Sequence, residues 1–192
     1  MSHMSTGEQF PNLMFETYSG KKMQISEAIK GKKYSIFWMM RYIGCRLCQC
    51  DLDLLAEQYD RFMDANAQVF AVVQSRKETI RKLKGEYSVP FEIICDTKHE
   101  FYEALDVKAT ATREDRMPKD AYGKEKHALK MQEVESRHYG KISGDGEEVQ
   151  QLPALFIVNE EGKLIYIHYA EYTVDIPDID EMIKLLDGLN LK

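Results

Sequence analysis

The sequence predicts an α/β protein with a central mixed β-sheet flanked by helices, and three observations support this prediction. Two apolar runs, residues 34–40 and 68–73, are nearly continuous, which is typical of strands buried on both faces of a parallel sheet. A helical apolar period follows each run, as in strand–helix–strand crossovers. Residues 154–158 and 163–169, joined by a turn that ends at Gly162, predict an antiparallel hairpin in the same sheet.

The elements that precede the first buried strand are short. Residues 13–24 predict an N-terminal hairpin that turns at Gly20. Ser26 is expected to cap a short helix over residues 27–30, which Gly31 ends.

A long amphipathic helix is predicted to begin at Arg46, shortly after the first buried strand. Its apolar residues recur at steps of four and three, which places them on one face of a helix. This stripe consists of Cys48, Leu52, Leu55, Tyr59 and Phe62. The spacing therefore predicts one continuous helix.

Capping sequences place the next helix and the last one. Ser75, with Glu78 three residues later, predicts a helix that stops at Gly85. Asp178 with Glu181 predicts a last helix that continues to about Asp187.

A third strand and a charged segment lie between these two helices. Residues 91–95 predict the strand, and Asp96 or Thr97 is expected to cap a short helix over residues 98–105. The charged segment then begins at residue 107.

Residues 107–150 are densely charged and poor in large apolar side chains. We interpret them as an insertion into a single domain that spans residues 1–192, because a loop of this length inside a compact domain is uncommon. The middle of the insertion, about residues 119–138, predicts a helix of weak periodicity.

Composition excludes several classes of protein. The chain has 192 residues and a formal net charge of -6, so no basic surplus indicates nucleic-acid binding. No apolar run of about 18 residues predicts a membrane span. The N-terminus lacks the basic and apolar regions of a secretory signal. We therefore expect a cytoplasmic protein that binds neither nucleic acid nor membranes.

The placement of the cysteines points to redox chemistry. Cys45, Cys48 and Cys50 fall within six residues, whereas a disulfide scaffold spreads its cysteines along the chain. A zinc or iron–sulfur site is the alternative, but the spacing matches no paired CxxC arrangement and no histidine lies at ligand spacing. We therefore expect neither a metal nor a cofactor.

Cys45 is predicted to be the reactive thiol. It lies where a buried strand meets a helix N-terminus, whose unpaired amides and dipole favour a thiolate. Arg41 and Arg46 add positive charge nearby. Cys48 follows one helical turn later on the apolar stripe. We therefore expect an exposed, attacking Cys45, a buried, resolving Cys48, and a disulfide between them on oxidation.

The other two cysteines are expected to be less important. Cys50 falls on the polar face of the helix with Asp53 and Glu57, which predicts a partly exposed spare thiol. A glutathionylation site or an alternative resolving cysteine are the other interpretations of Cys50. Cys95 ends a strand expected two positions from the strand before Cys45, about 9.5 Å away. We interpret Cys95 as a core thiol that is too distant to form a disulfide.

Pro153 directly precedes a predicted central strand, where proline removes a hydrogen-bond donor from the ladder. A cis peptide with the proline facing a functional site would explain this placement. The plainer interpretation is a proline at the entry to a strand.

The arrangement of these residues resembles the thioredoxin fold. The likeness is carried by Gly-Cys-Arg-Leu-Cys between strand and helix and by the final hairpin beginning Leu-Pro-Ala. The N-terminal hairpin and residues 89–105 resemble the peroxiredoxin branch, the alkyl hydroperoxide reductase/thiol-specific antioxidant family. The resemblance covers about residues 15–189, apart from the insertion. It implies a peroxiredoxin-type fold with Cys45 attacking, Cys48 as its CxxC partner, and Pro153 as a cis-proline beside the site.

Two features differ from the pattern of that family. Peroxiredoxins have a proline seven residues, and a threonine or serine three residues, before the attacking cysteine, where this chain has Trp38 and Tyr42. Their catalytic arginine has no clear match around residues 151–154. Because a hydroxyl and an arginine polarise the peroxide, we expect thiol–disulfide exchange to be faster than peroxide reduction.

The sequence therefore predicts an antioxidant-type oxidoreductase that acts on a peroxide or a disulfide and is reduced by a thioredoxin-like protein or glutathione. Arg41, Tyr42, Arg46 and Pro153 are the candidate supporting residues around the two thiols. We also consider a homodimer. A non-catalytic redox sensor or interaction module switched by the disulfide, and a metal-binding cysteine cluster, remain as alternatives.

Overall fold

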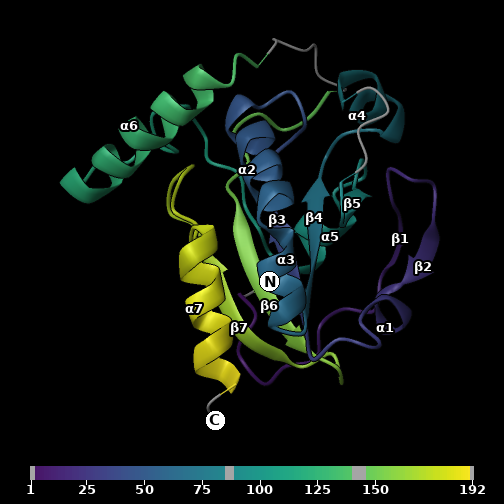
Figure 1. The fold of residues 1–192 in the computed structure, drawn as a ribbon. Coiled ribbons are helices and arrows are strands. Elements are labelled where there is room, and N and C mark those ends of the chain that lie inside the picture. Colours follow the sequence, from purple (N-terminus) through teal and green to yellow (C-terminus); the bar gives the residue numbers. More distant parts are fainter. Residues whose placement is uncertain (1–2, 85–88, 140–145, 191–192) are drawn as a thin grey trace.

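A five-stranded sheet lies at the centre of the computed structural model, which describes residues 3–84, 89–139 and 146–190 (Figure 1). The strand order is β5-β4-β3-β6-β7. The strands are β3 (Tyr34–Met39), β4 (Ala67–Val73), β5 (Glu92–Cys95), β6 (Ala154–Asn159) and β7 (Leu164–Tyr169). The predicted helix end at Gly85 lies outside the described residues.

The sheet is mixed, as the sequence predicted. β3 pairs in parallel with β4, and β4 pairs in parallel with β5. β6 pairs antiparallel with β3 and with β7, so the predicted hairpin closes one side of the sheet. Every residue of β3 is buried, because helices or loops cover both faces of this central strand.

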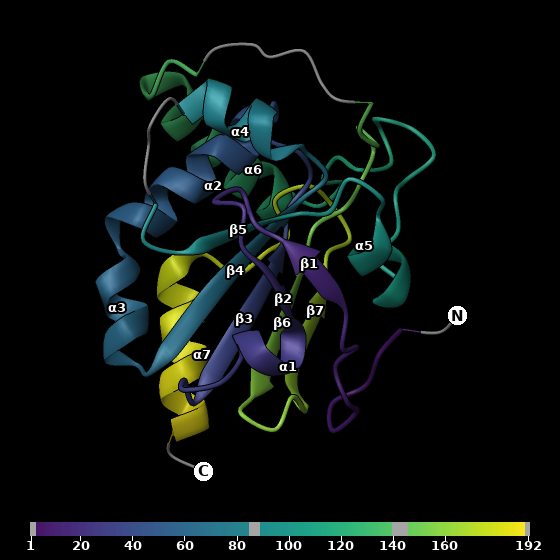
Figure 2. The same cartoon turned by 90° about the vertical axis from the view of Figure 1, so that its right-hand side faces the viewer.

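Four helices contribute to the core on one face of the sheet: α2 (Arg46–Glu57), α3 (Tyr59–Asp64), α4 (Lys77–Lys84) and α7 (Ile179–Asn190). Ile36 and Trp38 of β3 point into this layer. The other face packs against α1 (Ile25–Ala28), α5 (Glu100–Ala104) and the hairpin of β1 (Met14–Glu16) and β2 (Lys22–Gln24) (Figure 2). Phe37 and Met39 point into this second layer. The predicted N-terminal hairpin is therefore confirmed.

The predicted long helix is interrupted, which corrects the expectation of one continuous element. Gln58 leaves the helical conformation, with φ -119° and ψ 14°, and separates α2 from α3. The apolar stripe nevertheless continues, because Tyr59 and Phe62 remain buried against the sheet. The Tyr59 hydroxyl accepts a hydrogen bond from the Val69 amide at 3.4 Å, which attaches α3 to β4.

The predicted caps have mixed outcomes. The Asp96 carboxylate accepts the amides of Glu100 and Phe101 at 2.9 and 2.8 Å, so Asp96 anchors the start of α5. The first helix begins at Ile25, one residue before the expected cap at Ser26. α4 covers Lys77–Lys84.

The last helix begins as predicted and runs further than expected. The amide of Asp178 donates to the Glu181 carboxylate at 2.7 Å, and the Glu181 amide donates to Asp178 at 2.8 Å. This reciprocal pair is the predicted capping box. α7 then continues to Asn190.

The charged segment 107–150 leaves and rejoins the fold at one place. The Thr110 amide donates to the Gln150 carbonyl at 3.0 Å, and the Leu152 amide donates to the Lys108 carbonyl at 3.2 Å. Between these ends lies α6 (Ala121–Ser136), inside the predicted range of 119–138, and it packs against α2. Of the helices in the described part of the chain, none is long and apolar enough to cross a membrane.

Candidate redox site

Cys45 occupies the N-cap position of α2, just beyond the carboxyl end of β3. Its backbone is extended, and its Sγ accepts a hydrogen bond from the Cys48 amide at 3.5 Å. The Nη1 of Arg41 donates to the same sulfur at 3.3 Å. The predicted meeting of this thiol with a helix N-terminus is therefore present in the structure.

These contacts lower the pKa of Cys45 to about 6. The largest cause is a hydrogen bond from the Cys48 thiol, followed among the favourable causes by the charge of Arg41 and the Cys48 amide; burial opposes them. Both donors and the positive charge stabilise the thiolate more than the thiol. Cys45 is therefore largely a thiolate near neutral pH.

The pKa of Cys48 shifts in the opposite direction. Burial raises its pKa well above the ordinary value, and the hydrogen bond to Cys45 and the charge of that thiolate raise it further. The expected asymmetry between an acidic Cys45 and a protonated Cys48 agrees with these directions. The expected exposure of Cys45 is wrong, because only 6% of the residue is exposed, compared with 5% of Cys48. The side chain of Arg41 lies against the Cys45 sulfur, and Arg41 in turn donates to the Val149 carbonyl at the end of the charged segment.

Of the two candidate arginines, Arg41 donates a hydrogen bond to the Cys45 sulfur, whereas Arg46 is exposed at the surface. Arg41 is buried, and its Nη2 donates to the Val149 carbonyl. Its guanidinium also lies 5.2 Å from the centroid of the Tyr42 ring. The buried Nε of Arg41 has no hydrogen-bond partner among the described residues.

Arg116 is a second cation near the thiols that the sequence did not indicate. Its Nε donates to Gln150 at 2.8 Å and its Nη1 donates to Thr173 at 3.3 Å. Burial lowers the pKa of Arg116, the charge of Arg41 lowers it further, and the charge of Cys45 raises it. No sequence signal distinguishes Arg116 from the many other charges of segment 107–150.

Pro153 lies beside the site, but its peptide bond is not cis. The described residues contain no cis peptide, so the expectation of a cis-proline is wrong. β6 begins only at Ala154, so a proline at position 153 costs no ladder hydrogen bond and the plainer interpretation of a strand-entry proline holds. The Pro153 carbonyl accepts the Ala170 amide at 3.2 Å.

Cys50 is fully buried, which corrects the prediction of a partly exposed thiol. The face of α2 that carries Cys50 is polar in sequence, but α6 packs against this helix. Burial is also the main cause of the raised pKa of Cys50. The pattern of α2 alone does not predict the burial of Cys50, because the helix that covers it comes from a distant part of the chain.

Cys95 ends β5, which lies two strands from β3, as expected. It is half-buried and not a core residue, because β5 is the last strand on its side of the five-stranded sheet. Burial raises the pKa of its thiol to about 12. All four cysteines are free thiols in this structure.

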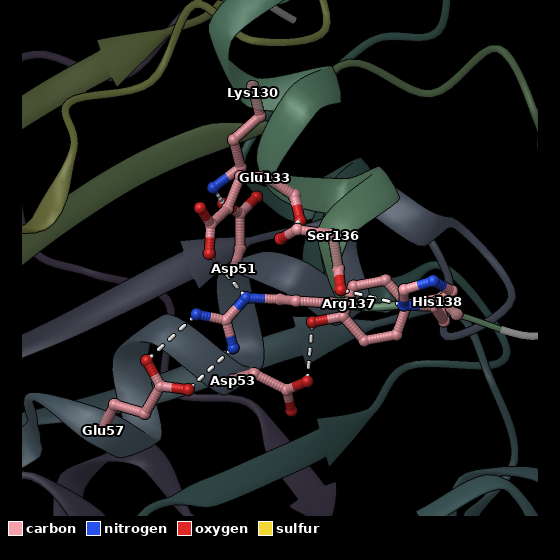
Figure 3. A network of polar contacts seen from close by, with 9 residues as sticks. Asp51, Asp53, Glu57, Lys130, Glu133, Ser136, Arg137 and His138 are labelled. Atoms are coloured by element: carbon pink, nitrogen blue, oxygen red, sulfur yellow. Dashed lines mark hydrogen bonds and ion pairs between the residues drawn. The ribbon is translucent and has the colours of Figure 1, made fainter.

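A network of polar contacts joins α6 to α2 (Figure 3). Asp51 pairs with Lys130, and both oxygens of Glu57 accept from Arg137 at 2.6 and 3.0 Å. Tyr139 donates to Asp53 at 2.6 Å. The described residues include no group of three or more His, Cys, Asp or Glu side chains placed to hold a metal ion.

A pocket of about 360 Å³ adjoins the site, and we call it the α2–α6 pocket. Cys48 and Pro153 lie in its wall, together with residues of α2, α6 and the segment 173–180. The sequence did not indicate this pocket, because parts of the chain that are distant in sequence form it.

Comparison with known proteins agrees with the fold. The crystal structure of peroxiredoxin 6 of Arenicola marina superimposes with a TM-score of 0.68 at 16% identity, over 98% of this chain and 74% of that one. The fold thus places this chain in the thioredoxin-like class, in its peroxiredoxin form. The model of the AhpC/TSA family matches residues 6–167, and the chain belongs to this family. The predicted fold and family are therefore confirmed, and the expectation of an oxidoreductase is confirmed at the level of the family.

Two relatives from Bacillus subtilis (strain 168) carry related names. The thiol-disulfide oxidoreductase ResA is 28% identical over 110 residues, which are 57% of this chain and 60% of that protein. The putative peroxiredoxin YkuU is 22% identical over 200 residues, 98% of this chain and 91% of that protein. The match to ResA thus spans less than two thirds of its length.

Proposed function

We propose that this protein is a thiol–disulfide oxidoreductase in which Cys45 attacks the substrate and Cys48 resolves the intermediate. The observation that carries the proposal is the contrast between two neighbouring thiols: the Cys45 sulfur accepts from Arg41 at 3.3 Å and from the Cys48 amide at 3.5 Å, which lowers its pKa, whereas burial raises the pKa of Cys48. A thiolate is the nucleophile in disulfide exchange, and the neighbouring thiol stays protonated until it is needed.

The reaction has two steps. The Cys45 thiolate attacks one sulfur of a substrate disulfide, forms a mixed disulfide, and releases the other substrate sulfur as a thiolate. Cys48 then loses its proton and attacks the Cys45 sulfur, which forms the Cys45–Cys48 disulfide and releases the second substrate thiol. The substrate gains two electrons and the protein loses two, with the Cys48 proton passing to a departing thiolate.

A reductant must restore the two thiols after each turnover. We assign this role to a thioredoxin-like protein or glutathione, both of which supply thiols for the reverse exchange. The free cysteines of the structure suit a reducing compartment, and we propose the cytosol.

The test is a single-turnover reduction of a disulfide-bonded peptide by reduced protein. Cys45→Ser should abolish reduction, because it removes the nucleophile. Cys48→Ser should stop the reaction at a mixed disulfide on Cys45, which mass spectrometry detects as added peptide mass. Cys95→Ser is the matched control and should react as wild type does.

Two results would contradict the proposal. One is wild-type rates for Cys45→Ser. The other is peptide mapping of the oxidised protein that finds Cys45 joined to Cys50 or Cys95.

Peroxide reduction is the second candidate, and one contact favours it. The Nη1 of Arg41 lies 3.3 Å from the Cys45 sulfur, where a guanidinium would stabilise charge that develops on a peroxide oxygen. Relatives named as peroxiredoxins match the chain as well. The two activities are distinguished by their relative rates at Cys45.

A further inference from the structure

We propose that the α2–α6 pocket receives an uncharged, apolar side chain of a polypeptide disulfide substrate, next to the substrate cysteine that Cys45 attacks. This inference rests on the proposed thiol–disulfide exchange and names its substrate class. It gives the charged insertion a role, because α6 forms one wall of the pocket.

The pocket lies one helical turn from the attacking sulfur. Cys48 and Pro153 line it, and Cys48 follows Cys45 by three residues, a rise of about 4.5 Å along α2. Consecutive residues of an extended peptide are about 3.3 Å apart. A substrate cysteine bonded to Cys45 would therefore place a neighbouring residue at this pocket.

Part of the pocket lining is apolar. Leu54 of α2, Ile176 and Ile179 line the pocket, and so do the buried side chains of Trp38 and Met40. Leu129 of α6 also lines the pocket, yet 59% of this leucine is exposed. An apolar side chain that covers Leu129 would remove this surface from water, which is favourable at about 25 cal/mol per Å².

Most charged groups in the wall have partners within the chain; Arg41, which also lines the pocket, donates to the Cys45 sulfur and the Val149 carbonyl, while its Nε has no hydrogen-bond partner among the described residues. Lys130 pairs with Asp51, and Lys126 donates to the Ile176 carbonyl at 2.7 Å and approaches Glu181 at 3.5 Å. On the acidic side, Glu133 pairs with Arg137, Asp180 pairs with Arg61, and Asp178 accepts the Glu181 amide.

This pairing decides which ligand the pocket favours. A charged ligand group beside these paired residues would lose water without gaining an unpaired ionic partner, which is costly. An uncharged apolar group does not have this desolvation cost. The apolar part of the wall and these paired groups are therefore complementary to a neutral, apolar side chain.

The size of the pocket agrees with this occupant. About 360 Å³ lies at the lower end of the range for ligand pockets, which is roughly 300–1,000 Å³. A leucine or phenylalanine side chain fits within this space, and the rest of the peptide stays outside.

The experiment compares three disulfide-bonded peptides that differ only beside the cysteine, where they carry phenylalanine, serine or aspartate. Reduced wild-type protein should reduce the phenylalanine peptide roughly five- to tenfold faster than the serine peptide, measured as single-turnover kcat/KM. The aspartate peptide should also be slower than the phenylalanine peptide, because a carboxylate gains nothing from the apolar lining. Equal rates for all three would overturn the pocket assignment and leave the proposed function intact, whereas no reduction of any peptide would contradict the proposed function.

A pair of variants on α6 tests the same inference through the protein. Leu129→Ser should reduce the preference for the phenylalanine peptide over the serine peptide roughly three- to tenfold. Tyr122→Ser is the matched control, because Tyr122 is 64% exposed on the same helix and lies outside the pocket wall. Wild-type preference in Leu129→Ser, or an equal loss in both variants, would overturn the inference.

A binding measurement gives a readout without turnover. Trp38, the single tryptophan of the chain, lines the pocket and is buried. Titration of Cys45→Ser protein with the phenylalanine peptide in its reduced form should change the tryptophan fluorescence in a saturable way. The reduced serine peptide should not change it over the same concentrations, and identical responses to the two peptides would contradict the inference.

Discussion

Two cysteines three positions apart differ in acidity because of what surrounds them. Cys45 sits at a helix N-terminus and accepts from Arg41, whereas burial and the neighbouring thiolate keep Cys48 protonated. Neither side chain is freely exposed, so selectivity between them depends on charge and hydrogen bonding more than on access.

The first prediction concerns the pH dependence of Cys45. Because its pKa is lowered to about 6, the thiolate predominates above this pH and is lost as the pH falls through it. Alkylation of Cys45 by iodoacetamide should therefore decrease steeply below about pH 6, while Cys48 stays slow up to about pH 9. Peptide mapping after timed alkylation measures both rates. Equal rates at the two thiols across this range would refute the assignment.

The second prediction separates the two nearby arginines. Arg41→Gln removes the charge that faces the Cys45 sulfur and should raise the midpoint of its alkylation profile by about one pH unit or more. Arg46→Gln removes an exposed charge and serves as the control, with an expected change of only a few tenths. A larger shift in Arg46→Gln than in Arg41→Gln would show that surface charge controls the thiol.

At the scale of elements, α6 is attached to α2 mainly by polar side chains. Only Gly123 and Val134 of α6 are buried, while ion pairs and hydrogen bonds join Lys130, Arg137 and nearby Tyr139 to the acidic face of α2. A helix held in this way opens more easily than one held by a broad apolar face. The burial of Cys50 depends on this attachment.

The third prediction follows from that dependence. Arg137→Met breaks the paired contact with Glu57 and should speed the alkylation of Cys50 about two- to fivefold, since an exposed ion pair contributes at most about 1 kcal/mol. Lys124→Met changes an exposed position of the same helix and should leave Cys50 unaffected. If Cys50 reacts equally in wild type and both variants, its burial is independent of this ion pair.

The fourth prediction uses two helical glycines. A Cβ at Gly123 would lie 2.7 Å from both Pro118 and Tyr172, so Gly123→Ala should destabilise the protein by about 1–3 kcal/mol. Gly188 of α7 is exposed with open space around it, so Gly188→Ala should stabilise by about 0.5–1 kcal/mol. Denaturant unfolding measures both changes, and the same sign for the two variants would contradict the packing of α6.

For the whole molecule, the end of the sheet positions the thiols and the charged segment 107–150 supplies much of what surrounds them. β3 ends just before the site, Pro153 leads into the neighbouring β6, and Arg116 and α6 come from segment 107–150. The resulting environment contains arginines and an apolar pocket, and it has Tyr42 where peroxiredoxins have a small hydroxyl residue. This combination suits a disulfide better than a peroxide.

The fifth prediction is the relative rate of the two reactions. Stopped-flow Trp38 fluorescence of reduced protein should show faster oxidation by the phenylalanine peptide disulfide than by an equal concentration of hydrogen peroxide. Tyr42 stands where peroxiredoxins have a small hydroxyl residue, and loss of one hydrogen-bond donor aimed at the charge that develops on the peroxide commonly lowers the rate by about 10²–10³. Cys45→Ser is the control and should remove both signals. If hydrogen peroxide oxidises the protein far faster than the disulfide does, the prediction is wrong, and Arg41 or Arg116 takes the role of the arginine that polarises the peroxide.

The fold was predictable from sequence because its signals are local. Apolar runs identified β3 and β4, and the capping pair of Asp178 and Glu181 identified the start of α7. The position of Cys45 at a helix N-terminus was predictable for the same reason.

The surroundings of the thiols were much less predictable, because they depend on contacts between distant segments. Whether Cys50 is buried depends on α6, and the choice between Arg41 and Arg46 depends on side-chain direction, which a spacing pattern does not give. The peptide before Pro153 is not cis, and β6 begins only after this proline, which the local sequence does not reveal.

The contact between Arg41 and Cys45 also bears on the redox equilibrium. In the reduced protein the buried guanidinium faces a thiolate, whereas a Cys45–Cys48 disulfide carries no charge and would leave Arg41 without its counter-ion. Stabilising the dithiol in this way makes the disulfide a stronger oxidant, and for a two-electron couple every 1.4 kcal/mol corresponds to about 30 mV of reduction potential. The arginine that activates the nucleophile therefore also raises the reduction potential of the Cys45–Cys48 pair. Regeneration of the dithiol by a reductant becomes thermodynamically easier. Reduction of a substrate disulfide becomes less favourable to the same extent.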